Sequence, residues 1–232
     1  MLGLLVQLAI SWLIVWFYDR KNLSVLGLRP TRTRIGYLGV FGIVTGIACA
    51  LGFILKMYFG NVVWGLNPEL SPLLVFAGLW WTIKSVLFEE LIFRGVLLYI
   101  LLRTLGRLRA ILLSAAAVGI YHWFSFGVIG NPMAMATTFF ITGMMGLVLA
   151  YGYAKTLSLY LPVGIHLGWN LTQIFIFSSG PIGPGVFITE QADSFRTNSY
   201  LIFLLVTFLP VVLALCTSYL LIRRINPRAI QS

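Results

Sequence analysis

Six polar residues within largely apolar stretches could take part in chemistry: Glu89, Glu90, Arg94, His122, His166 and Asn170. The pairs Glu90–Arg94 and His166–Asn170 are each four residues apart, so within a helix each pair lies on one face. Because a helix turns by about 100° per residue, Glu89 points away from Glu90 and is free to face the histidines. Carboxylates, imidazoles and an amide together fit the hydrolysis of an amide bond by water.

Such a hydrolysis needs a base for the attacking water and hydrogen-bond donors for the oxyanion that forms. A poorly solvated carboxylate is a stronger base, so Glu89 could take the proton while His122 orients the water. His166 and Asn170 could donate to the oxyanion. No serine, cysteine or aspartate pairs with a histidine at a recognisable spacing, which disfavours a nucleophilic triad.

The same residues allow other interpretations. Glu90 and Arg94 could pair only to lower the cost of placing charges in a membrane. A membrane histidine often bonds to a neighbouring helix, and polar clusters within membranes also serve proton relays and transport. The spacing alone therefore leaves an enzyme, a transporter and a structural clamp open.

The composition indicates a helical membrane protein. Of the 232 residues, 59% are hydrophobic and only 9% are charged, against about 25% charged in soluble domains. The apolar runs are continuous and do not alternate, which argues against a β-barrel. The net charge of +10 lies in short segments between these runs, so membrane topology explains it and we expect no nucleic-acid partner.

Seven membrane spans are predicted, with eight as the alternative, at roughly residues 2–18, 35–59, 72–102, 110–128, 133–154, 158–178 and 200–222. One set of connections holds Arg20, Lys21, Arg29, Arg32, Arg34, Arg103, Arg107, Arg109, Lys155, Arg223, Arg224 and Arg228. The opposite set holds Glu69, Glu190, Asp193 and Arg196. Basic loops are cytoplasmic, which puts the N-terminus outside and the C-terminus in the cytoplasm of an all-α, single-domain bundle, 1–232.

Counting along the helices predicts one common depth for three of the candidate residues. Glu89, His122 and His166 lie 14, 13 and 11 residues from the last basic residue at the cytoplasmic end of their own spans. At 1.5 Å per residue they lie about 21, 20 and 17 Å from that edge. We therefore expect a single buried polar site. Lys56, near the outer end of its span, is interpreted as a side chain that reaches the membrane surface.

Three motifs in this region resemble those of the CPBP family, also called the ABI or CAAX-protease family. The segment EELIFR, from Glu89 to Arg94, resembles the EExxxR motif, and HLGWN, from His166 to Asn170, resembles HxxxN. His122 stands at the histidine of FxxxH, with Val118 in place of the phenylalanine. The resemblance covers about 72–178, the expected catalytic core.

The resemblance implies an intramembrane endopeptidase. Glu89 looks like the catalytic glutamate that activates water together with His122. His166 and Asn170 look like the oxyanion-stabilising pair, and the second glutamate and the arginine of EELIFR like supporting residues. Substrates would be membrane proteins or peptides within the lipid bilayer of a bacterial-type plasma membrane, and the bacterial relatives have diverse or unknown substrates, so the resemblance leaves open whether the substrate is prenylated. A non-catalytic immunity or binding protein and a proton-coupled transporter stay as alternatives.

A metal is the second open question. Glu89, His122 and His166 could form a zinc site with one open position. The HExxH arrangement is absent, and Asn170 beside His166 suits hydrogen-bond donation better than zinc ligation. We therefore favour a glutamate mechanism without a cofactor and keep zinc as the alternative.

Overall fold

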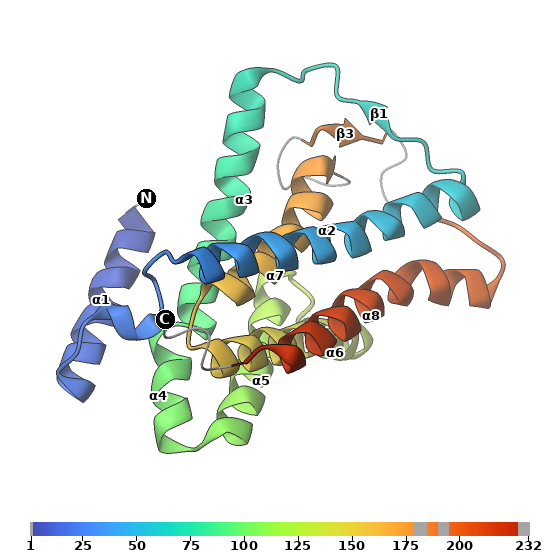
Figure 1. The fold of residues 1–232 in the computed structure, drawn as a ribbon. Helices are drawn as coiled ribbons and strands as arrows, with labels where there is room; N and C mark the ends of the chain where they lie inside the picture. Colours follow the sequence, from blue (N-terminus) through green and yellow to red (C-terminus); the bar gives the residue numbers. More distant parts are fainter. Residues whose placement is uncertain (1, 179–184, 190–194, 227–232) are drawn as a thin grey trace.

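The protein is a bundle of helices with a small sheet at one end (Figure 1). The computed structural model describes residues 2–178, 185–189 and 195–226. The elements in chain order are α1 (Leu2–Asp19), the 3₁₀-helix η1 (Leu23–Leu26), α2 (Arg32–Gly60), β1 (Gly65–Leu66), α3 (Pro72–Phe93), α4 (Val96–Thr104), α5 (Arg107–Ser125), α6 (Pro132–Thr156), α7 (Tyr160–Asn170), the π-helix η2 (Leu171–Ile176), β2 (Phe177–Ser178), β3 (Phe187–Ile188) and α8 (Tyr200–Arg224).

Four of the long helices begin at a polar capping residue. The side chains of Thr31, Ser71, Asn131 and Ser199 each accept a hydrogen bond from the backbone N–H three residues later. Such a cap satisfies one of the N–H groups that a helix start leaves without a partner. These caps set where α2, α3, α6 and α8 enter the bundle.

Five of the described helices, α1, α2, α5, α6 and α8, are long and apolar enough to cross a membrane. They coincide with five of the seven predicted spans, so the class of an all-α membrane protein is confirmed at this coarser level. The span predicted at 158–178 consists of the short α7 continued by η2. The exact number of spans and their orientation stay predictions.

The span predicted at 72–102 is not one helix, and the prediction of a continuous helix was wrong. Helix α3 ends at Phe93, and α4 begins at Val96. At Gly95 ψ is −131°, and a Cβ added there would overlap the carbonyl oxygen of Leu91. Ser114 Oγ, on α5, donates to the carbonyl oxygen of Phe93 at 3.0 Å. The end of α3 is therefore held by α5.

Glycines bring α2 and α7 into direct backbone contact. A Cβ on Gly168 would overlap the carbonyl oxygen of Gly42, and one on Gly46 would lie 3.2 Å from Thr172 Oγ1. Thr45 Oγ1 adds a hydrogen bond of 2.9 Å to the carbonyl oxygen of Ile165. Small residues allow such close approach in membranes, and here they fix the helix that carries two site residues.

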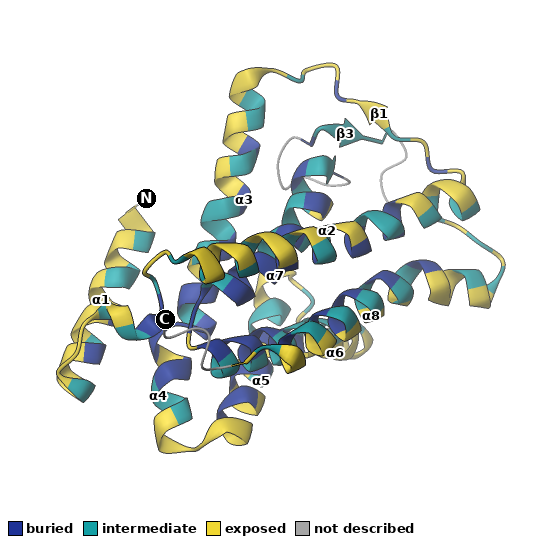
Figure 2. Cartoon of the chain, in the orientation of Figure 1, coloured by how far each residue is buried: buried dark blue, intermediate teal, exposed yellow. Residues whose placement is uncertain are grey.

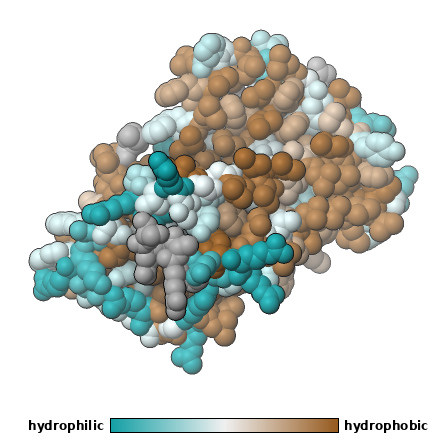
Figure 3. Space-filling view, viewed as in Figure 1, coloured by the Kyte–Doolittle hydropathy of each residue, from teal (hydrophilic) through white to brown (hydrophobic). Residues whose placement is uncertain are grey.

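The connections predicted to be cytoplasmic gather at one end of the bundle. Arg103 Nη1 contacts Asp19 Oδ2 at 2.5 Å, joining the ends of α4 and α1. Lys155 Nζ donates at 2.7 Å to the carbonyl oxygen of Arg223, joining the ends of α6 and α8. In Figure 3 hydrophilic residues gather on the lower left of the molecule, and hydrophobic residues cover most of the remaining surface. The side of the membrane that this end faces stays a prediction.

The other end carries a feature that was not predicted. Strand β3 pairs antiparallel with β1 and parallel with β2 in a three-stranded sheet. Figure 2 shows that α1 and the outer faces of α2 and α3 are largely exposed, as lipid-facing surfaces are. The loop residues Glu190 and Asp193, most of the segment SSGPIGPG, and Arg228 lie outside the described residues.

Candidate active site

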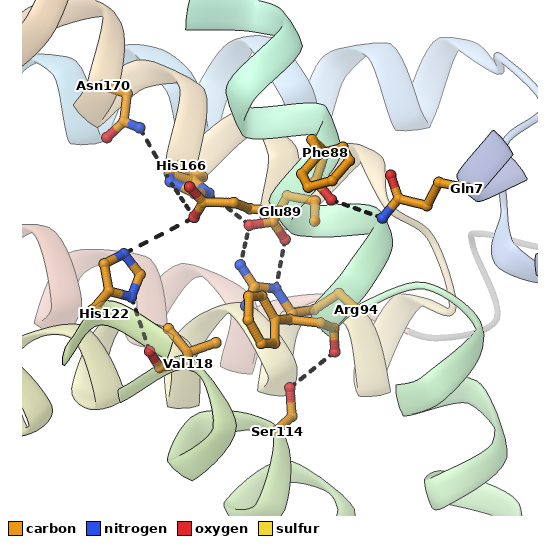
Figure 4. Close-up of polar contacts among 11 residues, drawn as sticks. Gln7, Phe88, Glu89, Arg94, Ser114, Val118, His122, His166 and Asn170 are labelled. Atoms are coloured by element: carbon orange, nitrogen blue, oxygen red, sulfur yellow. Dashed lines mark hydrogen bonds and ion pairs between the residues drawn. The ribbon is translucent and has the colours of Figure 1, made fainter. Parts of the chain in front are cut away.

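Three helices bring the candidate residues together, as the common depth predicted. The end of α3 carries both glutamates, the last turn of α5 carries His122, and α7 carries His166 and Asn170. Figure 4 shows the side chains of the three helices converging, with both imidazoles directed toward the carboxylate of Glu89. The predicted depth of Glu89, about 21 Å from the cytoplasmic edge, assumed one continuous helix from Glu89 to Arg103. Because the helix is interrupted at Gly95, that distance no longer follows from the residue count.

Glu90 lies at the buried side of the site. Its side chain is fully buried, and it forms a two-pronged ion pair with Arg94, which is 1% exposed. One prong joins Arg94 Nε to Glu90 Oε2 at 2.6 Å, and the other joins Arg94 Nη2 to Glu90 Oε1. The predicted pairing of these two residues is confirmed. Two parallel hydrogen bonds fix both side chains in one geometry.

Glu90 also contacts His166, a contact that was not predicted. His166 Nδ1 lies 2.7 Å from Glu90 Oε1. A carboxylate at this distance accepts a hydrogen bond, so Nδ1 of His166 carries the proton. Asn170 Nδ2 then donates to His166 Nε2 at 3.2 Å. Arg94, Glu90, His166 and Asn170 thus form one connected chain of hydrogen bonds.

Glu89 lies at the open side of the site and makes looser contacts. Its Oε2 atom is 4.0 Å from His122 Nε2 and 3.9 Å from His166 Nε2, and the three side chains are 13–17% exposed. These separations exceed a direct hydrogen bond. One water could contact Glu89 Oε2 and His122 Nε2 at about 2.8 Å each, as bridging waters do.

The backbone of α5 sets the orientation of His122. Its Nδ1 atom lies 2.9 Å from the carbonyl oxygen of Val118. A carbonyl oxygen only accepts, so Nδ1 is the donor and Nε2 keeps a lone pair directed toward Glu89. Val118, which replaces the phenylalanine of the resembling motif, is buried, and it orients His122 through its main chain.

The site opens into a cavity of about 380 Å³. Its walls include Glu89, His122, His166 and Asn170, and Arg94 also reaches it. Helices α2 and α8 supply a large share of the lining, with Cys49, Gly52, Phe53, Lys56, Val206, Thr207, Pro210 and Val211. These two helices lie outside residues 72–178, the expected catalytic core.

The donor groups give a mixed fit to a metal ion. Both histidines bond through Nδ1 to an acceptor and direct Nε2 toward Glu89, as zinc-binding histidines do. However, the 3.9 and 4.0 Å separations exceed the roughly 3.3 Å between donors that lie 2.0–2.1 Å from a tetrahedral zinc. Asn170 also occupies Nε2 of His166. Among the described residues, no group of three or more His, Cys, Asp or Glu could hold a metal.

One comparison with known proteins found a match. The family model described as "Type II CAAX prenyl endopeptidase Rce1-like" matches residues 71–172. The matched segment runs from the cap of α3 to the start of η2 and contains all six residues singled out from the sequence. No curated protein and no solved structure matches the chain at the significance required.

Proposed function

We propose that the protein is a CAAX-type intramembrane protease in which Glu89 activates the water that cleaves the peptide bond, because residues 71–172 match the Rce1-like family model. The observation that carries the proposal is the 4.0 Å gap between Glu89 Oε2 and His122 Nε2. A water in this gap can donate one hydrogen bond to each of these acceptors. Its oxygen lone pairs then face the cavity, where a peptide carbonyl would lie.

Glu89 is the base in this proposal. As the water oxygen attacks the carbonyl carbon, one proton passes to Glu89 and a tetrahedral intermediate forms. The protonated Glu89 then gives the proton to the leaving amine, and the C–N bond breaks to release an acid and an amine. General base catalysis of this kind contributes about 10²- to 10⁴-fold to a rate.

His166 and Asn170 stabilise the oxyanion. Asn170 keeps a second N–H beyond the one that it gives to His166. Glu90 accepts from Nδ1 of His166 and stabilises positive charge on the ring. When Nε2 takes up a proton from water in the cavity, it no longer accepts from Asn170, and both Nε2 and the Asn170 amide then donate to the substrate oxygen. A carboxylate plays a comparable orienting role toward the histidine of a serine protease.

We propose that this mechanism runs without a metal, with zinc held by Glu89, His122 and His166 as the alternative. The wide donor separations and the contact of Asn170 with His166 support the metal-free form. We expect cleavage to persist in a strong chelator. The protein assayed should contain less than about 0.1 equivalent of bound zinc. Loss of cleavage that returns with added zinc would favour the alternative.

The test of the function is direct detection of products. The purified protein, in bilayer nanodiscs, is incubated with membrane-anchored peptides ending in Cys-Val-Ile-Met, with and without a farnesyl group on the cysteine. Mass spectrometry should find a released tripeptide that is absent with Glu89→Gln. Accumulation of solutes in liposomes, dependent on Glu89 and a proton gradient and without peptide products, would show a transporter instead.

A further inference from the structure

Lys56 brings a positive charge to the cavity wall. Cys49, Gly52, Phe53 and Lys56 recur at helical spacing on one face of α2, and all four line the cavity. The ammonium of Lys56 lies 5.3 Å from the centroid of the Phe53 ring, and that ring stacks on Phe177 at 4.6 Å. The interpretation of Lys56 as a side chain that only reaches the membrane surface is therefore incomplete.

The ammonium of Lys56 contacts an aromatic ring, but it has no carboxylate partner among the described residues. Among the described residues, no carboxylate lies within 4.0 Å of its ammonium. Arg94, the other basic side chain at the cavity apart from the histidines, is paired with Glu90. Lys56 is partly exposed, and an ammonium on a cavity wall attracts groups of opposite charge. Lys56 therefore favours a ligand that carries a negative charge into the cavity.

The distance from Lys56 to the hydrolytic residues can be counted along α2. Gly46 packs against Gly168, two residues before Asn170. The ammonium of Lys56 lies over Phe53, which is seven residues beyond Gly46. At 1.5 Å per residue this places the charge about 10 Å from the level of Asn170. An extended tripeptide spans about 10 Å as well.

We propose that Lys56 binds the C-terminal carboxylate of the substrate, three residues beyond the cleaved bond. The inference rests on the proposed function, because a tail of the C-a-a-X type ends three residues after its cysteine. Lys56 then sets specificity by measuring the length of the leaving peptide. A longer tail would carry its carboxylate past the ammonium, and an amidated tail would carry no charge to it.

Binding to Glu89→Gln tests this inference without any cleavage. Three fluorescent farnesylated peptides are compared in phosphatidylcholine nanodiscs: one ending in Cys-Val-Ile-Met as the free acid, its C-terminal amide, and a form extended by two residues. The free acid should bind at least about tenfold more tightly than the other two, as expected when an ion pair forms on binding. Fluorescence anisotropy gives the three Kd values.

Substitutions of Lys56 test whether this residue causes the tighter binding of the free acid. Lys56→Met, in the Glu89→Gln background, should bind acid and amide within about twofold of each other, whereas Lys56→Arg should keep the preference. Lys84→Met is the matched control, because Lys84 lies on α3 and is not among the residues that line the cavity. It should keep the full preference for the acid.

The two proposals fail in different ways. Equal Kd values for the acid and the amide in the Glu89→Gln protein, or no measurable binding of either, would show that Lys56 does not bind the C-terminal carboxylate. This conclusion would hold for any result with the Lys56 variants. Release of the tripeptide by the unmodified protein, measured separately, tests the hydrolysis alone. Cleavage of acid and amide peptides at equal rates would leave the hydrolytic function standing and remove the role of Lys56.

Discussion

Glu89 and Glu90 are neighbours on α3, and their surroundings differ in almost every respect. Glu90 is fully buried, and both of its oxygens are bonded, to Arg94 and His166. Glu89 is 17% exposed, lines the cavity, and has imidazole nitrogens only at 3.9 and 4.0 Å. One carboxylate is committed to protein partners, whereas the other leaves space for a water.

This difference assigns different roles to two adjacent residues of α3. A fully buried carboxylate with both oxygens bonded to protein groups is not placed to take a proton from a substrate water, but it can hold a histidine and an arginine in place. A carboxylate with open acceptors at a cavity can act as a base.

The largest effect on stability is expected for Glu90→Gln. The change leaves Arg94 buried without its ion pair, and breaking a buried pair costs about 3–5 kcal/mol. Thermal unfolding in detergent should show a strongly lowered Tm. Glu69→Gln, at an exposed position, should change stability by less than about 0.5 kcal/mol. Equal Tm values for Glu90→Gln and the unmodified protein would contradict the role of the ion pair.

Gly168→Ala should weaken the side of the site that both glutamates face. The new Cβ would overlap the carbonyl oxygen of Gly42 and push α7 from α2, at a cost of about 1–3 kcal/mol. A displacement near 1 Å can lower a rate about 100-fold. Gly39→Ala is the control, because a Cβ there meets no atom within 4 Å. Similar cleavage rates for both variants would argue against the importance of this contact.

Ser114→Ala should loosen the helix end that carries the two glutamates. It removes the hydrogen bond to the carbonyl oxygen of Phe93, which is buried, at a cost of about 1–3 kcal/mol. We expect a lower Tm and a smaller loss of cleavage than with Gly168→Ala. Ser71→Ala removes a hydrogen bond at the other end of the same helix, at an exposed cap. It should cost about 1 kcal/mol and leave the cleavage rate per folded molecule unchanged.

Val118→Ala is expected to have the smallest effect on catalysis. His122 is oriented by the carbonyl oxygen of residue 118 and not by its side chain, so Ala preserves the hydrogen bond. The cleavage rate should fall less than about tenfold. The free energy of unfolding should fall by about 0.5–2 kcal/mol because of the buried cavity, which lowers Tm. A loss of cleavage as large as that of Glu89→Gln would show that the Val118 side chain itself builds the site.

The sequence predicted those parts of the molecule that depend on local pattern. Continuous apolar runs indicated membrane helices, and the four-residue spacing of Glu90 and Arg94 predicted their ion pair. Both histidines converge on Glu89 as expected. The catalytic roles assigned to these residues stay predictions.

Features that depend on packing between distant segments were not predictable in the same way. The break at Gly95 depends on a backbone geometry that the sequence EELIFRGVLL does not specify by itself. The bond of Glu90 to His166 joins residues 76 positions apart. The cavity walls from α2 could have been suspected, because Cys49, Gly52, Phe53 and Lys56 already form one helical face in the sequence.

The central claim is that Glu89 carries the chemistry while Glu90 holds the site, and one paired measurement tests it most directly. The cleavage rate and the Tm are measured on the same preparation of Glu89→Gln in nanodiscs. We predict a rate at least about 100-fold lower with a Tm within about 2 °C of the unmodified protein. Cleavage within about threefold of the unmodified rate, in protein with an unchanged Tm, would contradict the account.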